Sequence, residues 1–232
     1  MEISPLLKAS KEGNLEEVTK LHKKGADLNE GHKNGSTALI FAAEGGHFEL
    51  VKYLIENGAD PAVATKMGAT ALNRAAESGN TKIMKYLLKN GTPIGDLALI
   101  VAAREGHEGA VKLLIENGAD ENAQQRWGQT ALMLAAREGH NGVIKLLLDH
   151  GANVRLKDKN GDTALNIAND NDNLDVAMQL KRAGAKAEVK KTAPVPVVDE
   201  DEDADDSDDD TTADVNDLIS EDDLPDDVEL GD

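Results

Sequence analysis

Residues 130–140 read Thr-Ala-Leu-Met-Leu-Ala-Ala-Arg-Glu-Gly-His, and this stretch decides the fold. A near copy lies 33 residues earlier, where residues 97–107 read Leu-Ala-Leu-Ile-Val-Ala-Ala-Arg-Glu-Gly-His. Gly-Ala or Gly-Thr dipeptides recur in phase with these copies and begin at Gly25, Gly58, Gly91, Gly118, Gly151 and Gly184. Successive dipeptides are 33 residues apart, except that Gly91 and Gly118 are 27 apart. A fixed period of this size is typical of a stacked array of small supersecondary units.

The spacing inside one unit predicts two helices followed by a polar loop. Thr37 can cap a first helix that carries Leu39 and Ala42 on one face and stops at Gly45. A second helix is predicted from about Phe48 to Glu56. The residues expected to be buried on second helices include Leu50, Val51, Leu54, Ile55, Leu113, Leu114, Leu146 and Leu147. A polar stretch then leads to the next threonine, so the sequence predicts an all-α repeat solenoid of helix–turn–helix units joined by hairpin loops.

These recurring residues resemble the ankyrin repeat, whose pattern combines a Gly-x-Thr-Pro-Leu-His turn, Ala-Ala, Gly-His, a Leu-rich helix and Gly-Ala-Asp. The resemblance covers about residues 4–186, some four-fifths of the chain, and is specific because it recurs in phase. It implies a solenoid domain over residues 1–186 with six repeats. It also implies a non-catalytic protein–protein interaction module that binds its partner through the concave face.

The helix-starting turn departs from the family pattern at two positions. The family's proline is replaced by alanine at Ala38, Ala71, Ala98, Ala131 and Ala164. The family's histidine is replaced at Ile40, Asn73, Ile100, Met133 and Asn166. Alanine is the best helix former, so the helices are expected to persist, whereas the bonds that this histidine makes between repeats are in question.

The junction between Gly91 and Asp96 is six residues shorter than its counterparts. The hairpin is therefore expected to be missing there or reduced to a tight turn, with Asp96 as the substitute helix cap. The two end units are degenerate: residues 4–30 lack the capping threonine, and residues 169–173 replace Ala-x-x-Gly-His. Polar end repeats of this kind are the expected caps of a solenoid.

Charge divides the chain into a neutral body and an acidic end. Residues 199–232 contain nineteen Asp and Glu and no Lys or Arg, whereas residues 1–198 contain 25 acids and 25 bases. The sequence predicts a disordered acidic tail over residues 199–232, joined by a Pro-containing linker over residues 187–198. The start of the chain does not resemble a signal peptide, and no apolar run approaches the roughly 18 residues of a membrane span, so a cytoplasmic protein is expected, or a nuclear one in a eukaryote.

The sequence shows no constellation that favours catalysis over a structural explanation. It has no cysteine, and its glycines punctuate helices instead of forming a phosphate-binding loop. His47, His107 and His140 recur at one site of the repeat, which would stack them about 10 Å apart and favours a structural role over a zinc site. Neither enzymatic activity nor a cofactor or metal is expected.

The residues that the repeat leaves free are candidates for binding a partner. In the family, hairpin tips and the turns after Ala-Ala face the concave groove. The mapped positions are Lys66, Met67, Glu77, Arg104, Glu105, Arg126, Trp127, Gln129, Arg137, Glu138 and Lys159. Trp127 is the sole tryptophan and is predicted to lie among Arg104, Arg126 and Arg137, residue types enriched in binding hot spots. Alternatively, Trp127 folds over its own hairpin, and the arginines pair with Glu105 and Glu138.

Other functions remain open at this stage. The acidic tail is either a solubilising spacer or the active part of a chaperone or decoy for basic proteins, with the solenoid as its anchor. A structural assembly role is a further alternative, although a monomer is favoured. The tail is also predicted to compete with external partners for the concave groove. Phosphate on Ser207 or Ser220, which precede acidic residues, is expected to strengthen binding of the tail to the groove. A neutral body with an acidic tail argues against nucleic acid as partner.

Overall fold

The computed structural model describes residues 3–186 of the 232-residue chain. This part contains twelve α-helices and no strand, confirming the all-α prediction. The helices are α1 (Pro5–Lys11), α2 (Leu15–Lys23), α3 (Ala38–Glu44), α4 (Phe48–Glu56), α5 (Ala71–Glu77), α6 (Thr81–Lys89), α7 (Asp96–Arg104), α8 (Glu108–Glu116), α9 (Ala131–Glu138), α10 (Asn141–Asp149), α11 (Ala164–Asp170) and α12 (Leu174–Arg182). No helix in the described range is long and apolar enough to cross a bilayer. The predicted linker and acidic tail lie outside the described residues.

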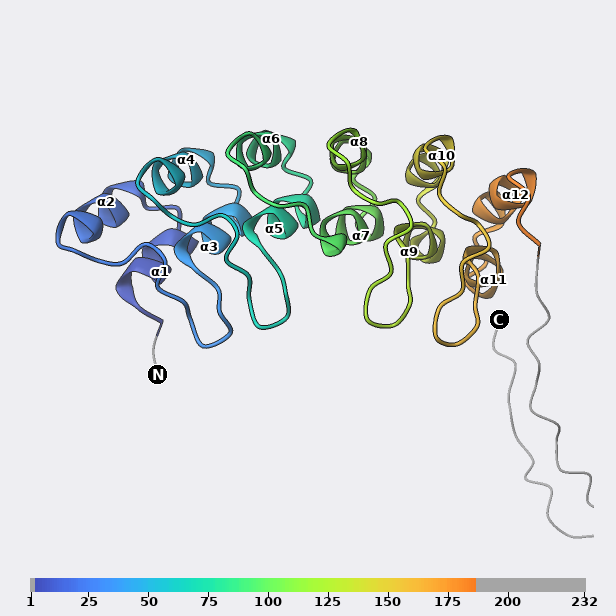
Figure 1. Cartoon of the computed structure of the whole chain (residues 1–232), viewed down its shortest axis with the longest axis horizontal. Coiled ribbons are helices and arrows are strands. Elements are labelled where there is room, and N and C mark those ends of the chain that lie inside the picture. Colours follow the sequence, from blue (N-terminus) through green and yellow to red (C-terminus); the bar gives the residue numbers. More distant parts are fainter. Residues whose placement is uncertain (1–2, 187–232) are drawn as a thin grey trace, which may run out of the picture. The chain divides into compact units, whose positions relative to one another are not determined.

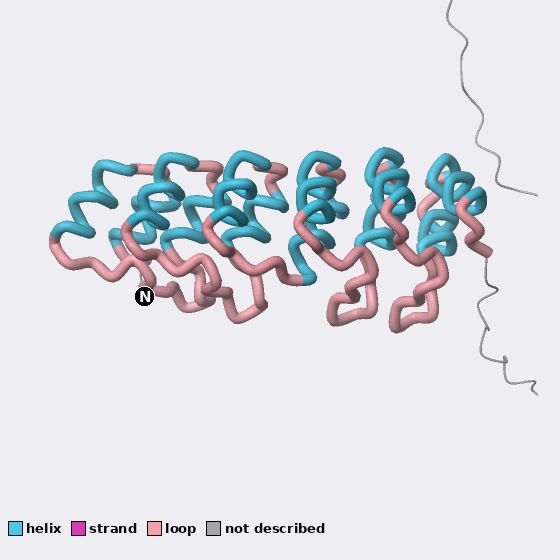
Figure 2. The backbone as a smooth tube through the Cα atoms, turned by 45° about the horizontal axis from the view of Figure 1, so that its top comes forward, coloured by secondary structure: helices cyan, strands magenta, loops and turns pink. Residues whose placement is uncertain are grey.

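The helices alternate between two rows (Figure 1). The odd-numbered helices form an inner row and the even-numbered helices an outer row, and each inner helix packs against the inner helices of its neighbours. Loops project beyond the inner row, as the tube in Figure 2 shows. We call them the first finger (residues 24–37), the second finger (57–70), the third finger (117–130) and the fourth finger (150–163). Residues 90–95, the short junction, connect α6 to α7 without a finger.

The core between the rows consists of Ala, Leu, Ile, Val and Met. Alanines of the inner helices, such as Ala42 and Ala75, are fully buried, which lets neighbouring inner helices approach closely. On the outer helices Leu114 and Leu147 are fully buried, as predicted. The prediction was wrong for Ile55, Leu113 and Leu146, which are only partly buried. An outer helix also contacts the outer helices beside it, but less closely than the inner helices contact one another, so the flanks of its apolar stripe stay open to water.

Side-chain caps begin most of the inner helices. The Thr37 hydroxyl accepts a hydrogen bond from the N–H of Ile40 at 3.4 Å, and Ser4 does the same for Leu7 in the first repeat, where threonine is absent. The prediction that Asp96 caps α7 was wrong. The cap residue is Gly95, which makes no side-chain bond, and Asp96 is the first residue of the helix. The short junction enters α7 two residues earlier than a finger would, which leaves Asp96 in the first turn, where a carboxylate favours the helix dipole.

Candidate partner-binding surface

The tips of the four fingers share one turn. In each, a residue before the tip donates its N–H to a carbonyl four residues on, at 2.8 to 3.0 Å, and a glycine adopts a left-handed conformation. Within this five-residue turn, the second residue is a cation, the third precedes the glycine and the fourth is the glycine. The tips are Lys33-Asn34-Gly35, Lys66-Met67-Gly68, Arg126-Trp127-Gly128 and Lys159-Asn160-Gly161. The sequence therefore places one cation at the same position of every tip.

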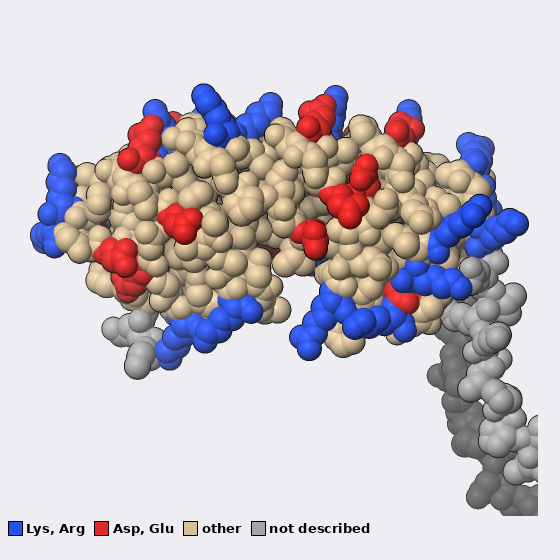
Figure 3. Space-filling model, viewed as in Figure 1, with Lys and Arg blue, Asp and Glu red and all other residues tan. Residues whose placement is uncertain are grey.

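None of the four tip cations has a carboxylate within 4.0 Å among the described residues. The lysines of the outer helices differ, because Lys52 and Lys112 each lie 3.9 Å from a glutamate one turn away. Figure 3 shows Lys and Arg gathered along the edge formed by the fingers. This edge therefore presents positive charge that the fold itself does not neutralise.

Two of the tips are also apolar. Met67 is 88% exposed and Trp127 is 63% exposed, whereas the first and last fingers carry Asn34 and Asn160 at this position. The Trp127 ring centroid lies 5.9 Å from the Arg126 guanidinium and 6.0 Å from the Lys159 ammonium. These distances allow cation–π attraction, and most of the ring remains open to solvent.

The predicted site residues fall into two groups, separated by the length of an inner helix. Lys66, Met67, Arg126, Trp127 and Lys159 lie at the finger tips, with Gln129 beside them, where its side chain accepts a hydrogen bond from Gln125 at 2.8 Å. Glu77, Arg104, Glu105, Arg137 and Glu138 lie at the C-terminal ends of α5, α7 and α9. Fingers lead into the N-terminal ends of α5 and α9, and the short junction leads into that of α7. Only Arg126 among the three predicted arginines therefore reaches Trp127, and the predicted proximity of Arg104 and Arg137 to this ring was wrong.

In the second group, Arg104 pairs within the fold. Its guanidinium lies 2.7 Å from Glu105 and 3.0 Å from Glu77, and Glu77 also lies 2.7 Å from Arg74. The hydrogen bond to Glu105, together with the charge of Glu77, raises the pKa of Arg104 above its ordinary value. The alternative in which the arginines pair with Glu105 and Glu138 therefore holds for Arg104, which pairs with Glu105. Glu77 ties α5 to α7.

The recurring histidines connect successive repeats. The Nε2 atoms of His47, His107 and His140 lie 3.2, 3.0 and 2.8 Å from carbonyl oxygens of Lys11, Glu77 and Arg104, one repeat earlier. A carbonyl only accepts, so each Nε2 carries a hydrogen, which confirms the predicted structural role. Among residues 3–186, no three His, Asp or Glu side chains are grouped so that they could hold a metal ion.

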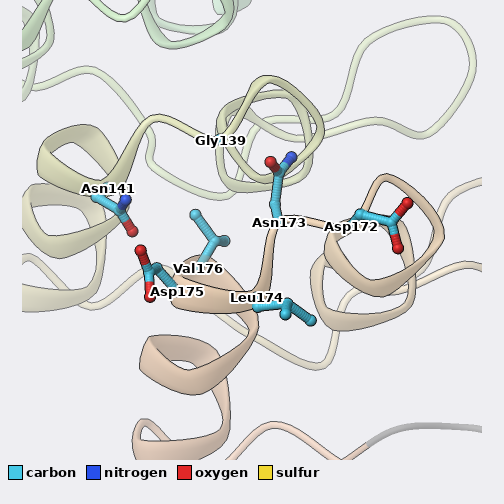
Figure 4. Close-up of a pocket in the computed structure, with 7 residues that line it drawn as sticks. All are labelled: Gly139, Asn141, Asp172, Asn173, Leu174, Asp175 and Val176. Atoms are coloured by element: carbon cyan, nitrogen blue, oxygen red, sulfur yellow. The ribbon is translucent and has the colours of Figure 1, made fainter.

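In the last repeat Asn173 replaces this histidine. Its amide donates to the carbonyls of Ala136 and Arg137 at 3.0 and 2.7 Å. Figure 4 shows Asn173 in a surface pocket of about 330 Å³ between the ends of neighbouring repeats, with Asp172 and Asp175 nearby. Because Asn173 is bonded to the preceding repeat, it caps the stack and is not a free polar group of the pocket.

The fingers are bonded to one another in two pairs. At the tips, the N–H of Lys66 donates to the carbonyl of Asn34 at 2.9 Å, and the N–H of Lys159 donates to the carbonyl of Trp127 at 3.0 Å. The first finger thus supports the second, and the third supports the fourth. Between the two pairs, over the short junction, lies the finger gap, a hollow with Lys and Arg on both rims in Figure 3. Met67 and Trp127 are the exposed apolar residues on either side of it.

Comparisons with known proteins agree with this architecture. The family model described as ankyrin repeats (3 copies) matches residues 6–98 and again residues 99–191. Curated protein sequences gave no match. Among solved structures, one of a predatory endopeptidase from Bdellovibrio bacteriovorus in complex with an immunity protein contains a similar chain, with 31% identity and a TM-score of 0.69. The match covers 78% of the present chain and 99% of that chain.

Proposed function

This chain belongs to the ankyrin-repeat family, and from that premise we propose that it is a non-catalytic binding module that holds a partner protein against its fingers. The observation that carries the proposal is the chemistry of the tips. Each tip bears a cation without a carboxylate partner in the described residues, and the two that flank the finger gap add an exposed Met67 and Trp127. Tryptophan and arginine are enriched in binding hot spots, and desolvating a large apolar side chain favours association.

The similar solved structure supports this proposal because it is a complex between two proteins. The tip chemistry supports a partner surface that carries carboxylates around an apolar residue. The second group of predicted site residues, at the ends of the inner helices, is expected to contribute less to partner binding. Glu77, Arg104 and Glu105 satisfy one another within the fold, so a partner would have to replace existing ion pairs to engage them.

The proposal is tested by affinity capture with the full chain as bait. A tip variant carries Lys66→Ala, Met67→Ala, Arg126→Ala and Trp127→Ala. A matched control carries Lys85→Ala and Lys145→Ala, two exposed cations of the outer helices. We expect proteins that bind the unmodified chain and the control but not the tip variant. Equal capture by all three baits would exclude the fingers as the binding surface.

The rival function, in which the acidic tail binds basic proteins, rests on residues 199–232, which lie outside the described residues, and stays a prediction from composition. The same capture experiment separates it from the proposal. Replacing the acidic residues of 199–210 by Ser and Gly in the full chain removes ten negative charges and leaves the fingers intact. A tail-dependent partner would be lost from this bait and retained by the tip variant.

A further inference from the structure

The finger gap leaves backbone groups without the partners that their counterparts have on the second finger. At the base of the first and second fingers, the side-chain amide of Asn29 bridges the two. It donates to the carbonyl of Gly58 at 3.2 Å and accepts from the N–H of Asp60 at 2.8 Å. Asn122 of the third finger likewise accepts from the N–H of Asn153 in the fourth at 2.7 Å. A side-chain amide from one finger is thus the bridge to the next.

The third finger has the same backbone groups, but the finger that would lie beside it is missing at the short junction. Gly118 and Asp120 occupy the positions of Gly58 and Asp60, yet within residues 3–186 nothing donates to the Gly118 carbonyl or accepts from the Asp120 N–H. At the tips, Met67 and Arg126 correspond to the bonded Asn34 and Lys66. The Met67 carbonyl and the Arg126 N–H are also without a partner in the described chain.

The floor of the gap holds a small cavity. It has a volume of about 130 Å³ and is lined by Ile94, Gly95, Asp96, Leu99, Gly118, Ala119 and Asp120. Gly118 and Asp120, whose backbone groups are unpartnered, therefore line a recess. The carboxylates of Asp96 and Asp120 at this recess oppose an anionic side chain and favour a neutral amide.

We propose that the finger gap is a docking slot for a hairpin-like loop of a partner protein, which takes the place of the missing finger. The loop would set an Asn or Gln side-chain amide against Gly118 and Asp120, as Asn29 does on the second finger. Its turn would bond the Met67 carbonyl and the Arg126 N–H. An apolar side chain would pack between Met67 and Trp127, and a carboxylate near the turn would pair with Lys66 or Arg126.

This inference rests on the proposed function and narrows it to one place and one kind of ligand. The slot selects for a finger-like backbone because its hydrogen-bonding groups are spaced as they are between two neighbouring fingers. Main-chain hydrogen bonds of this kind fix the position of the bound loop and accept many different side chains on it. Met67, Gly118, Asp120 and Arg126 are exposed residues, so water can bond their backbone groups when the slot is empty. Binding then replaces water with a loop whose groups match.

The first finger provides a probe. A cyclised peptide with the sequence of residues 24–37 contains Asn29 and the tip turn, so it imitates the missing finger. Its addition to the isotope-labelled full chain is followed by nuclear magnetic resonance. We expect saturable shifts of the Asp120 and Arg126 amides and of the Trp127 indole. The same peptide with Asn29→Ala should bind about tenfold more weakly, because it loses two hydrogen bonds.

A finger-restored chain serves as the matched control. It carries a copy of residues 24–37 in place of residues 90–97, which adds the six missing residues and returns the period to 33. We expect this chain to fold and to show none of the peptide-induced shifts, because its own finger fills the slot. Persistence of the shifts in this chain, or their absence from the unmodified one, would overturn the proposal.

Two other outcomes would also overturn it. Shifts confined to the Asp27 amide would place the peptide on the outer edge of the first finger. Shifts of Asp120 and Arg126 that grow with the concentration of the chain alone would assign the slot to a second copy. Failure here leaves the proposed function standing if the tip variant still loses its partner, so the two claims are separable.

Discussion

At the scale of single residues, the Gly-His pairs couple neighbouring repeats. Gly106 has a φ of +77°, and a Cβ at this position would lie 2.7 Å from the ring of His140, which belongs to the next repeat. The same ring bonds the carbonyl of Arg104. The glycine therefore serves two purposes, because it adopts the left-handed region and leaves space for the histidine above it.

Two glycines separate these effects. Gly106→Ala combines left-handed strain with a clash, whereas Gly118 has a φ of +90° and no atom within 4 Å of its missing Cβ. We expect Gly118→Ala to lower the free energy of unfolding by about 1–2 kcal/mol. Gly106→Ala should lower the free energy of unfolding by about 1–3 kcal/mol more than Gly118→Ala does, because the added methyl group overpacks against the His140 ring. Urea denaturation of both variants provides the measurement, and equal losses would show that the histidine ring moves aside without cost.

A second residue-scale prediction uses two adjacent leucines of α10. Leu147 is fully buried and Leu146 is partly buried. Leu147→Ala should lower the free energy of unfolding by about 2–5 kcal/mol, because it leaves a cavity between the layers. Leu146→Ala should cost clearly less, since water already reaches the site. Denaturant unfolding of the two variants measures the difference, and similar losses would contradict the observed burial.

At the scale of elements, the sequence predicted much of the array from glycine and threonine spacing. The 27-residue interval correctly located the short junction, because deletion of a finger leaves the 33-residue repeat unchanged on both sides of it. The cap of α7 was missed because Asp96 is a good cap residue and propensity alone favours it, whereas the entry path of the shortened chain decides the helix start. Nor did spacing reveal the unpartnered groups, since pairing between fingers depends on which neighbour is present.

The gap also has a dynamic consequence. The N–H groups of Lys66 and Asp60 are bonded across fingers, whereas those of Arg126 and Asp120 are not. Exchange is fast where backbone groups lack such bonds. In native-state hydrogen exchange, Arg126 and Asp120 should therefore exchange faster than their counterparts Lys66 and Asp60. Protection of all four to the same degree would mean that the third finger has a partner that the described residues lack.

At the scale of the whole molecule, the sequence predicted a binding surface on the fingers and on the ends of the inner helices. The prediction placed the wrong arginines beside Trp127. Arg104 and Arg137 follow Ala-Ala at helix C-termini, and sequence alone does not show that an entire inner helix separates them from the tips. What the sequence did contain is the tip pattern itself. Methionine and tryptophan replace asparagine only on the two fingers that border the deletion, and aligning the tips by register makes this visible.

The central claim is that a partner binds at the finger tips on either side of the gap. Hydrogen exchange by mass spectrometry, on the full chain alone and with its captured partner, tests this claim most directly. The account predicts slower exchange in the complex over residues 65–69 and 117–129, with no change in the outer helices α4, α6, α8 and α10. Protection confined to those outer helices, with the finger tips unchanged, would contradict it.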